Sequence, residues 1–224
     1  MVKAVLCDID GTLVQSNWLH AEAWRQAFAE MGIELEKEQV RRQIGKGGDE
    51  LIPVFVPWWK RDAVEEPLKS YRQWLFRQEF LAQVKPLPMV REFVEELKRR
   101  GIKMTLASSC KKPELEDYKR IMGIEDLVDE STSADDAERA KPHPDIFSVA
   151  LKKLGLDATE CVALGDTPYD AEAAGKAGVR TIGVETGGWS HDELMQAGCV
   201  EVYADVAELL ARLEQSAIVR EGLR

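Results

Sequence analysis

The sequence lacks the features that would crosslink it, anchor it or export it. Its four cysteines are scattered with no CxxC spacing, which argues against a disulfide framework and a zinc site. No apolar run approaches the roughly 18 residues that span a bilayer. The stretch before Asp8 is also too short for a signal peptide. We therefore expect a reduced, cytoplasmic protein that does not bind membranes.

Positive charge is also in short supply. The chain has 30 Lys+Arg against 40 Asp+Glu, a formal net charge of −10. This balance disfavours broad binding to nucleic acid through its phosphates. An enzyme of this charge that handles phosphate needs a local cation, and a bound metal is the usual one. The sequence does not settle the oligomeric state, although we favour a monomer.

What the sequence does contain is an alternation of strand and helix patterns. Short apolar runs typical of buried strands occur at residues 3–9, 102–107, 161–164, 179–184 and, more weakly, 199–203. Helical patterns between and after them cover about 88–100, 112–122, 144–155, 168–177, 191–197 and 205–215. This order predicts an α/β fold, a Rossmann-like parallel sheet with helices on both faces.

Residues 15–86 break the alternation, because they contain helical periodicity and no convincing strand. Apolar residues spaced by three and four form one stripe, which comprises Trp18, Ala21, Trp24, Ala27, Phe28 and Met31. A second stripe comprises Leu68, Tyr71, Leu75 and, more loosely, Trp74. We interpret residues 15–86 as a helical cap inserted into an α/β core that comprises residues 1–14 and 87–224.

The first strand ends in two acids, Asp8 and Asp10, followed by Gly11. Residues i and i+2 of a strand point to the same side, so both carboxylates can face one pocket. Gly11 permits the chain to turn away just beyond them. Ligands of open α/β sheets bind at the carboxyl ends of the strands. The alternative is a solvated loop with two capping aspartates.

A second acidic pair, Asp166 and Asp170, follows the strand that ends near Leu164. Thr167 can cap the next helix, with Pro168 at its first position. Asp166 would then lie at the same sheet edge as the first acidic pair. Acids gathered there would repel each other unless a hard cation such as Mg²⁺ neutralised them. The alternative for Asp170 is an ordinary acid in the first turn of a helix.

Two further segments carry groups that suit phosphate. Lys141 precedes Pro142-His143-Pro144, and the rigid turn would aim its ammonium at a phosphoryl oxygen. His143 is better interpreted as a turn residue than as a catalyst. Ser108 and Ser109 end another predicted strand, where a hydroxyl and free N–H groups can hold phosphate. Plain capping of the following helix explains these serines equally well.

Taken in order, these segments resemble the four motifs of the haloacid dehalogenase-like superfamily. The matching segments are DIDGTL at residues 8–13, Ser108, Lys141 and GDTPYD at residues 165–170. A helical insertion after the first motif resembles the C1 cap of the branch that contains phosphoglycolate phosphatase and β-phosphoglucomutase. Residues 20–24 also look like the start of that branch's cap. The resemblance covers nearly the whole chain.

The resemblance implies a role for each matching residue. Asp8 would be the nucleophile that becomes an aspartyl phosphate. Asp10 would protonate the leaving oxygen and later activate water. Ser108 would bind the transferred phosphoryl group, and Lys141 would stabilise its charge.

The resemblance also implies a metal site. Mg²⁺ would be held by Asp8, by the backbone carbonyl of Asp10 and by Asp166, with Asp170 supporting the metal indirectly. Dehalogenases and phosphonatases of the superfamily lack an acid at the position of Asp10, so this residue points to phosphate esters.

The expected function is therefore a magnesium-dependent phosphatase that acts on small phosphate monoesters of the sugar phosphate or phosphoglycolate type. The alternative enzyme is a sugar-phosphate mutase of the β-phosphoglucomutase type, which keeps the same two acids. A non-catalytic binding protein of the same fold would have lost a catalytic group, and none is missing. Magnesium is the expected cofactor, and a small phosphorylated metabolite is the expected partner.

Substrate contacts are expected from the cap. Arg42 and Lys46 lie in a glycine-containing segment that could hold an anionic group, or they could be solvated charges of a loop. His20 could contact substrate or shuttle a proton, or it could be a buried helix residue. The aromatic residues Trp58, Trp59, Trp74 and Phe76 could line an apolar pocket, although the cap's own core is the more frequent use of such residues.

Overall fold

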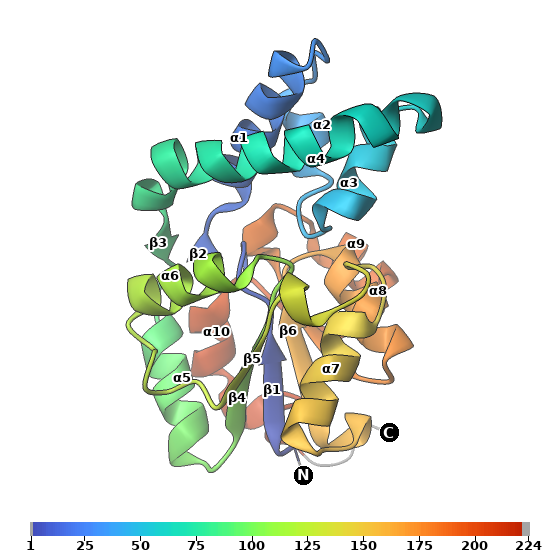
Figure 1. Cartoon of the computed structure of the whole chain (residues 1–224). Coiled ribbons are helices and arrows are strands. Elements are labelled where there is room, and N and C mark those ends of the chain that lie inside the picture. Colours follow the sequence, from blue (N-terminus) through green and yellow to red (C-terminus); the bar gives the residue numbers. More distant parts are fainter. Residues whose placement is uncertain (1, 221–224) are drawn as a thin grey trace.

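The computed structural model describes residues 2–220, and a six-stranded parallel sheet lies at its centre (Figure 1). Its strands, in spatial order, are β5 (Glu130–Thr132), β4 (Lys103–Ala107), β1 (Ala4–Cys7), β6 (Cys161–Gly165), β7 (Arg180–Val184) and β8 (Cys199–Tyr203). Every neighbouring pair is parallel. All carboxyl ends therefore meet at one edge, and the predicted α/β fold is confirmed.

Helices cover both faces of the sheet. One face packs against α5 (Val90–Arg99), α6 (Lys112–Met122) and α10 (Val206–Ala211), and the other against α7 (Asp145–Leu154) and α8 (Pro168–Lys176). A further helix, α9 (His191–Gln196), packs beside β7 and β8. The alternation of β1 divides its side chains between the two cores: Val5 and Cys7 belong to one, Ala4 and Leu6 to the other.

The predicted elements differ from the structure in three places. Strand β5 was not predicted, because its sequence Glu-Ser-Thr is polar and only Thr132 is buried. The helix expected over 205–215 ends at Ala211 and continues as a separate 3₁₀ turn, Leu213–Gln215. The helix expected from residue 88 begins at Val90, because Met89 adopts the left-handed conformation with φ of 62°.

Four helices lie above the carboxyl edge of the sheet (Figure 1). They are α1 (Asn17–Glu30), α2 (Lys37–Arg41), α3 (Gly48–Phe55) and α4 (Trp58–Leu75), the last followed by a π-helical turn, Phe76–Phe80. Two short antiparallel strands, β2 (Val14–Gln15) and β3 (Lys85–Pro86), carry the chain out of the sheet and back. Further 3₁₀ turns span Leu81–Gln83, Ala134–Asp136, Ala158–Glu160 and Glu185–Gly187. The domain limits given above for the core and the cap stay a prediction.

The cap helices enclose a small apolar core of their own. Ala21, Trp24, Phe28 and Leu68 are buried in it, as the two stripes predicted. The prediction is wrong for Trp18, which is half exposed because the stripe is wider than the surface available to cover it.

Trp58, Trp59 and Trp74 neither line a pocket nor form the core of the cap. Trp58, Trp59 and Trp74 are 74%, 66% and 54% exposed, and only Phe76 is buried. The three tryptophans lie on the outer surface. Among residues 2–220, no helix is both long enough and apolar enough to cross a bilayer.

Candidate active site

Asp8 lies where strand β1 ends, at the centre of the sheet. Its backbone N–H donates to the carbonyl of Leu164 (2.9 Å), which continues the β1–β6 pairing by one residue. The chain then turns at Gly11, whose φ is 83°. A Cβ at Gly11 would lie 2.3 Å from a carboxylate oxygen of Asp166, so only glycine fits this turn. The turn therefore brings the ends of β1 and β6 into direct contact.

Three buried carboxylates meet at this edge of the sheet. Oxygen atoms of Asp8, Asp166 and Asp170 lie within 4.8 Å of one another. Burial raises the pKa of Asp8 to about 8, and the charges of Asp170 and Asp10 act in the same direction. Burial, followed by the charges of Asp170 and Asp8, also raises the pKa of Asp166 well above its usual range. The cluster thus stores electrostatic repulsion.

Lys141 is the buried cation of this cluster. Its Nζ lies 2.5 Å from Asp8, 2.8 Å from Asp170 and 2.9 Å from the carbonyl of Ala107, to which it donates. Burial acts to lower the pKa of Lys141, but the charges of Asp170 and Asp8 outweigh it and raise that pKa. The side chain is therefore an ammonium ion that contacts Asp8, and its predicted contact with a phosphoryl oxygen stays a prediction.

Each acid of the cluster is held by neighbours from more than one segment. Asp166 accepts from Thr12 Oγ1 (2.9 Å) and from Asn17 Nδ2 (2.7 Å). Asp170 accepts from the hydroxyl of Thr167 (2.6 Å), and Thr167 caps helix α8 as expected. These bonds fix the carboxylates in place, so their geometry is set before any ligand arrives.

The cluster suits a divalent cation. Three carboxylates face a single ammonium, which leaves an excess of negative charge in a buried place. The donor atoms are all oxygen, the ligand type that Mg²⁺ prefers. Asp8, Asp166 and Asp170 are the side chains that could hold the ion.

A small cavity adjoins the acids, and a larger cavity adjoins the small one. Asp8, Asp10, Lys46 and Ser109 line the first, which has a volume of about 70 Å³. Ser108 is buried, and its hydroxyl accepts from the N–H of Cys110 (3.2 Å). The serine that lines the cavity is thus Ser109, and the predicted role of Ser108 stays a prediction.

The second cavity is larger and lies between helix α4 and the loops of the core. Its volume is about 410 Å³, and it shares a wall with the first, formed by Trp24, Arg72 and Ser109 among others. A cavity of this size can hold a metabolite. Because this cavity adjoins the small cavity that Asp8 lines, it leaves space for a leaving group.

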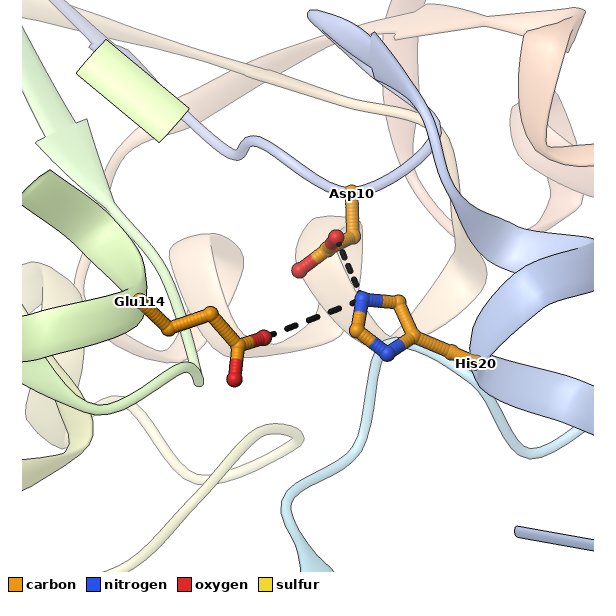
Figure 2. Close-up of side chains that lie close together, drawn as sticks. All are labelled: Asp10, His20 and Glu114. Carbon is orange, nitrogen blue, oxygen red and sulfur yellow. Dashed lines mark hydrogen bonds and ion pairs between the residues drawn. The ribbon is translucent and has the colours of Figure 1, made fainter. Parts of the chain in front are cut away.

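Asp10 lies apart from the three acids and is bound by a separate set of donors. Its Oδ1 lies 2.6 Å from Ser16 Oγ, 2.7 Å from His20 Nε2 and 2.8 Å from the hydroxyl of Tyr118. Figure 2 shows this oxygen facing His20 and the other oxygen pointing away. Burial acts to raise the pKa of Asp10, but the proximity of His20 and the three hydrogen bonds outweigh it and lower that pKa.

Helix α6 supplies the rest of this set. Glu114 lies 3.9 Å from His20 Nε2, and the two side chains face each other across the boundary between cap and core (Figure 2). Arg72 of α4 donates to His20 Nδ1 and lies 3.9 Å from Glu114. Because Nδ1 accepts this bond, the ring proton sits on Nε2 and faces Asp10. A nitrogen that carries a proton cannot bind a metal, so this second acidic group is not a metal site.

Sequence reasoning missed Arg72, Glu114 and Tyr118. Neither Arg72 nor Tyr118 belongs to a motif or to an apolar stripe that the sequence analysis identified. The signal that could have found the pair on α6 is the i,i+4 spacing of Glu114 and Tyr118 directly after a predicted sheet edge.

The cap segment that was expected to reach the substrate divides into two parts. Lys46 lines the small cavity, and burial lowers its pKa. Arg42 instead pairs with Glu193 (2.8 Å) and lies over the ring of Trp189, so it bridges cap and core. Substrate contact by His20, Arg42 or Lys46 stays a prediction.

Cys7 and His143 line neither of the two cavities. Cys7 is buried in an apolar core of the sheet, and burial raises the pKa of its thiol. His143 contacts Glu50 of the cap (3.1 Å).

Comparison with known proteins shows which family this chain belongs to. Residues 5–184 match the haloacid dehalogenase-like hydrolase family. Protein CbbY of Cereibacter sphaeroides is 30% identical over 233 residues, which cover 98% of this chain and 100% of that protein. A phosphoglycolate phosphatase of Yersinia pestis is 30% identical over 215 residues, with 93% and 92% covered. A hydrolase from Pseudomonas syringae has a TM-score of 0.87 at 27% identity, with 96% and 99% covered. This chain is therefore an enzyme and belongs to the haloacid dehalogenase-like hydrolases.

Proposed function

We propose that this protein is a magnesium-dependent phosphatase that hydrolyses small phosphate monoesters through an aspartyl phosphate on Asp8. The observation that carries the proposal is the contact between a buried carboxylate, Asp8, and a fully buried ammonium, Lys141, at the carboxyl edge of the sheet. A nucleophilic carboxylate beside fixed cations suits phosphoryl transfer, which asks mainly for positioning and charge stabilisation.

In the first step, an oxygen of Asp8 attacks phosphorus and the bond from phosphorus to the ester oxygen breaks. The leaving oxygen takes a proton from Asp10, so the alcohol departs neutral. Lys141 offsets the charge on the phosphoryl oxygens. Ser108 or Ser109 would hold the same group by its hydroxyl.

In the second step, water attacks the phosphorus of the aspartyl phosphate and gives its proton to Asp10. The bond from phosphorus to Asp8 breaks, inorganic phosphate leaves, and the Asp8 carboxylate is restored. Asp10 then carries the proton that the next leaving group needs. Its free oxygen, turned away from His20 in Figure 2, is the one that can exchange this proton.

Asp8, Asp166 and the backbone carbonyl of Asp10 would hold Mg²⁺, with Asp170 supporting them. The ion would supply charge neutralisation for the phosphoryl oxygens. The buried excess of negative charge supports this assignment.

The substrate is proposed to be a sugar phosphate or a compound of the phosphoglycolate type. The cavity of about 410 Å³, which adjoins the small cavity lined by Asp8, supports a leaving group of metabolite size. The name of the Yersinia pestis relative points to the same class. The four free cysteines and the absence of a membrane-crossing helix among residues 2–220 are compatible with a cytoplasmic enzyme.

The test is hydrolysis of an aryl phosphate in Mg²⁺ by the wild type and by Asp8→Asn. The amide cannot form an aspartyl phosphate, so turnover should fall to background. A phosphate-release screen over phosphorylated metabolites then identifies the substrate. Equal rates for the wild type and Asp8→Asn would refute the proposed nucleophile.

A sugar-phosphate mutase remains the second candidate, because the cap covers the site closely. His20 of the cap is 2% exposed, and it lies against Asp10 of the core. A cap that excludes water favours transfer to a sugar over hydrolysis. Supplying β-glucose 1-phosphate with a bisphosphate primer separates the two activities, because a mutase forms glucose 6-phosphate and a phosphatase releases inorganic phosphate.

A further inference from the structure

One oxygen of Asp10 receives three hydrogen bonds, and two of them depend on helix α6. Tyr118 of α6 donates its hydroxyl proton directly, because the contact with Asp10 (2.8 Å) is shorter than its contact with Glu114 (3.2 Å). His20 donates Nε2–H, because its Nδ1 accepts a hydrogen bond from Arg72 and therefore carries no proton. Ser16 is the third donor.

Arg72 can hold His20 in this way only while its own charge is balanced. Its side chain is 17% exposed, and Glu114, which is 3% exposed, is the carboxylate that faces it. An unpaired guanidinium in such a place would turn toward water and release Nδ1. The imidazole would then lose the bond that fixes which nitrogen carries its proton.

The same face of α6 meets the cap a second time. Asp117 lies one turn along from Glu114 and pairs with Arg77 at 2.9 Å. Tyr118 is fully buried between these contacts and the acid cluster. Residues 114, 117 and 118 therefore form one strip, spaced by three and four, that joins the cap to Asp10.

We propose that Tyr118, together with the Arg72–Glu114 pair acting through His20, positions Asp10 to receive the proton of the attacking water in the second step. Three donors on Oδ1 fix the plane of the carboxylate, and Oδ2 is the oxygen left to accept the proton. This inference rests on the proposed function and adds its positioning residues, which lie outside the four matching motifs.

The test is the fraction of enzyme trapped as aspartyl phosphate when turnover of a radiolabelled aryl phosphate is quenched in acid. An aryl leaving group needs little protonation, so the first step tolerates a misplaced Asp10. Slower hydrolysis of the intermediate raises the trapped fraction, whereas general damage to the site slows its formation and lowers that fraction. The trapped fraction is calculated relative to active enzyme. A parallel active-site titration gives that concentration, so unfolded molecules do not lower the fraction.

For Tyr118→Phe we expect kcat to fall about tenfold, the effect of one lost hydrogen bond to a charged group, while the trapped fraction rises. Glu114→Gln and Arg72→Met should change both quantities in the same directions, and Arg72→Lys should restore them in part. Tyr203→Phe is the matched control, because Tyr203 is also buried and its hydroxyl also donates to a carboxylate, that of Glu201 (3.0 Å). Both residues lie on β8, the edge strand of the sheet. The control variant should leave both quantities unchanged.

Two results would overturn the inference while leaving the phosphatase intact. Tyr118→Phe with wild-type kcat would show that the hydroxyl is not needed. A fall in kcat with an equal or lower trapped fraction would show a structural role only. Failure of the wild type to form any aspartyl phosphate on Asp8 would instead refute the proposed function.

Discussion

The buried acids make the stability of the metal-free protein depend on pH in an unusual direction. Asp8 has a pKa of about 8 in the folded protein and about 3.9 when unfolded. Between these values the folded state binds one more proton than the unfolded state. The free energy of unfolding therefore falls as pH rises, by about 1.4 kcal/mol per pH unit for this group alone.

Over the whole window, ionising Asp8 costs the folded state at most about 6 kcal/mol. Asp166, whose pKa is also raised, acts in the same direction. Mg²⁺ binds the ionised acids, so at pH 6 it must first displace the protons that the cluster holds. We therefore expect Mg²⁺ to raise the free energy of unfolding more at pH 8 than at pH 6.

The assay is urea unfolding, followed by tryptophan fluorescence, at pH 6 and pH 8 with either EDTA or Mg²⁺. Comparing the two media at each pH cancels every titrating group that lies far from the metal. Asp166→Asn is the control variant, because it removes one proposed ligand and should lose most of the response. An equal effect of Mg²⁺ at both pH values, or none at either, would refute the reasoning.

Three further changes test other parts of the account. Lys141→Met should lower the free energy of unfolding by about 3–5 kcal/mol in urea titrations above pH 8, where it leaves the ionised, buried Asp8 without its cation; a loss below about 1 kcal/mol would contradict the buried pair. Gly187→Ala should weaken Mg²⁺ binding in calorimetry, because its Cβ would lie 1.8 Å from an Asp166 oxygen, whereas Gly175→Ala, with no atom within 4 Å, should not. Trp58→Ser should change the free energy of unfolding by no more than about 0.5 kcal/mol in urea titrations, because the ring is 74% exposed. A large loss would mean that the ring of Trp58 is buried in solution.

Local sequence rules predicted the parts of the site that lie at strand ends. Asp8, Asp10 and Asp166 follow apolar runs, and parallel strands place their carboxyl ends at one edge, so proximity followed from topology alone. Strand β5 was not predicted, because it is recognised by its pairing with β4 and has no apolar run of its own. Edge strands of three polar residues carry no periodic signal.

The contacts between cap and core could not be predicted in the same way. Arg72, Glu114 and Tyr118 lie on two helices that meet only when the cap is placed on the sheet, and helical spacing reports a face but not what that face touches. The cap tryptophans show the same limit, because an apolar stripe predicts burial only where a partner covers it. Trp74 has no such cover and is 54% exposed.

The most direct test of the central claim is to quench turnover in acid and locate the phosphate by peptide mapping. The account predicts one acyl phosphate, on the peptide that contains Asp8, and none in Asp8→Asn. Phosphate on another residue, or turnover by Asp8→Asn at the wild-type rate, would contradict it.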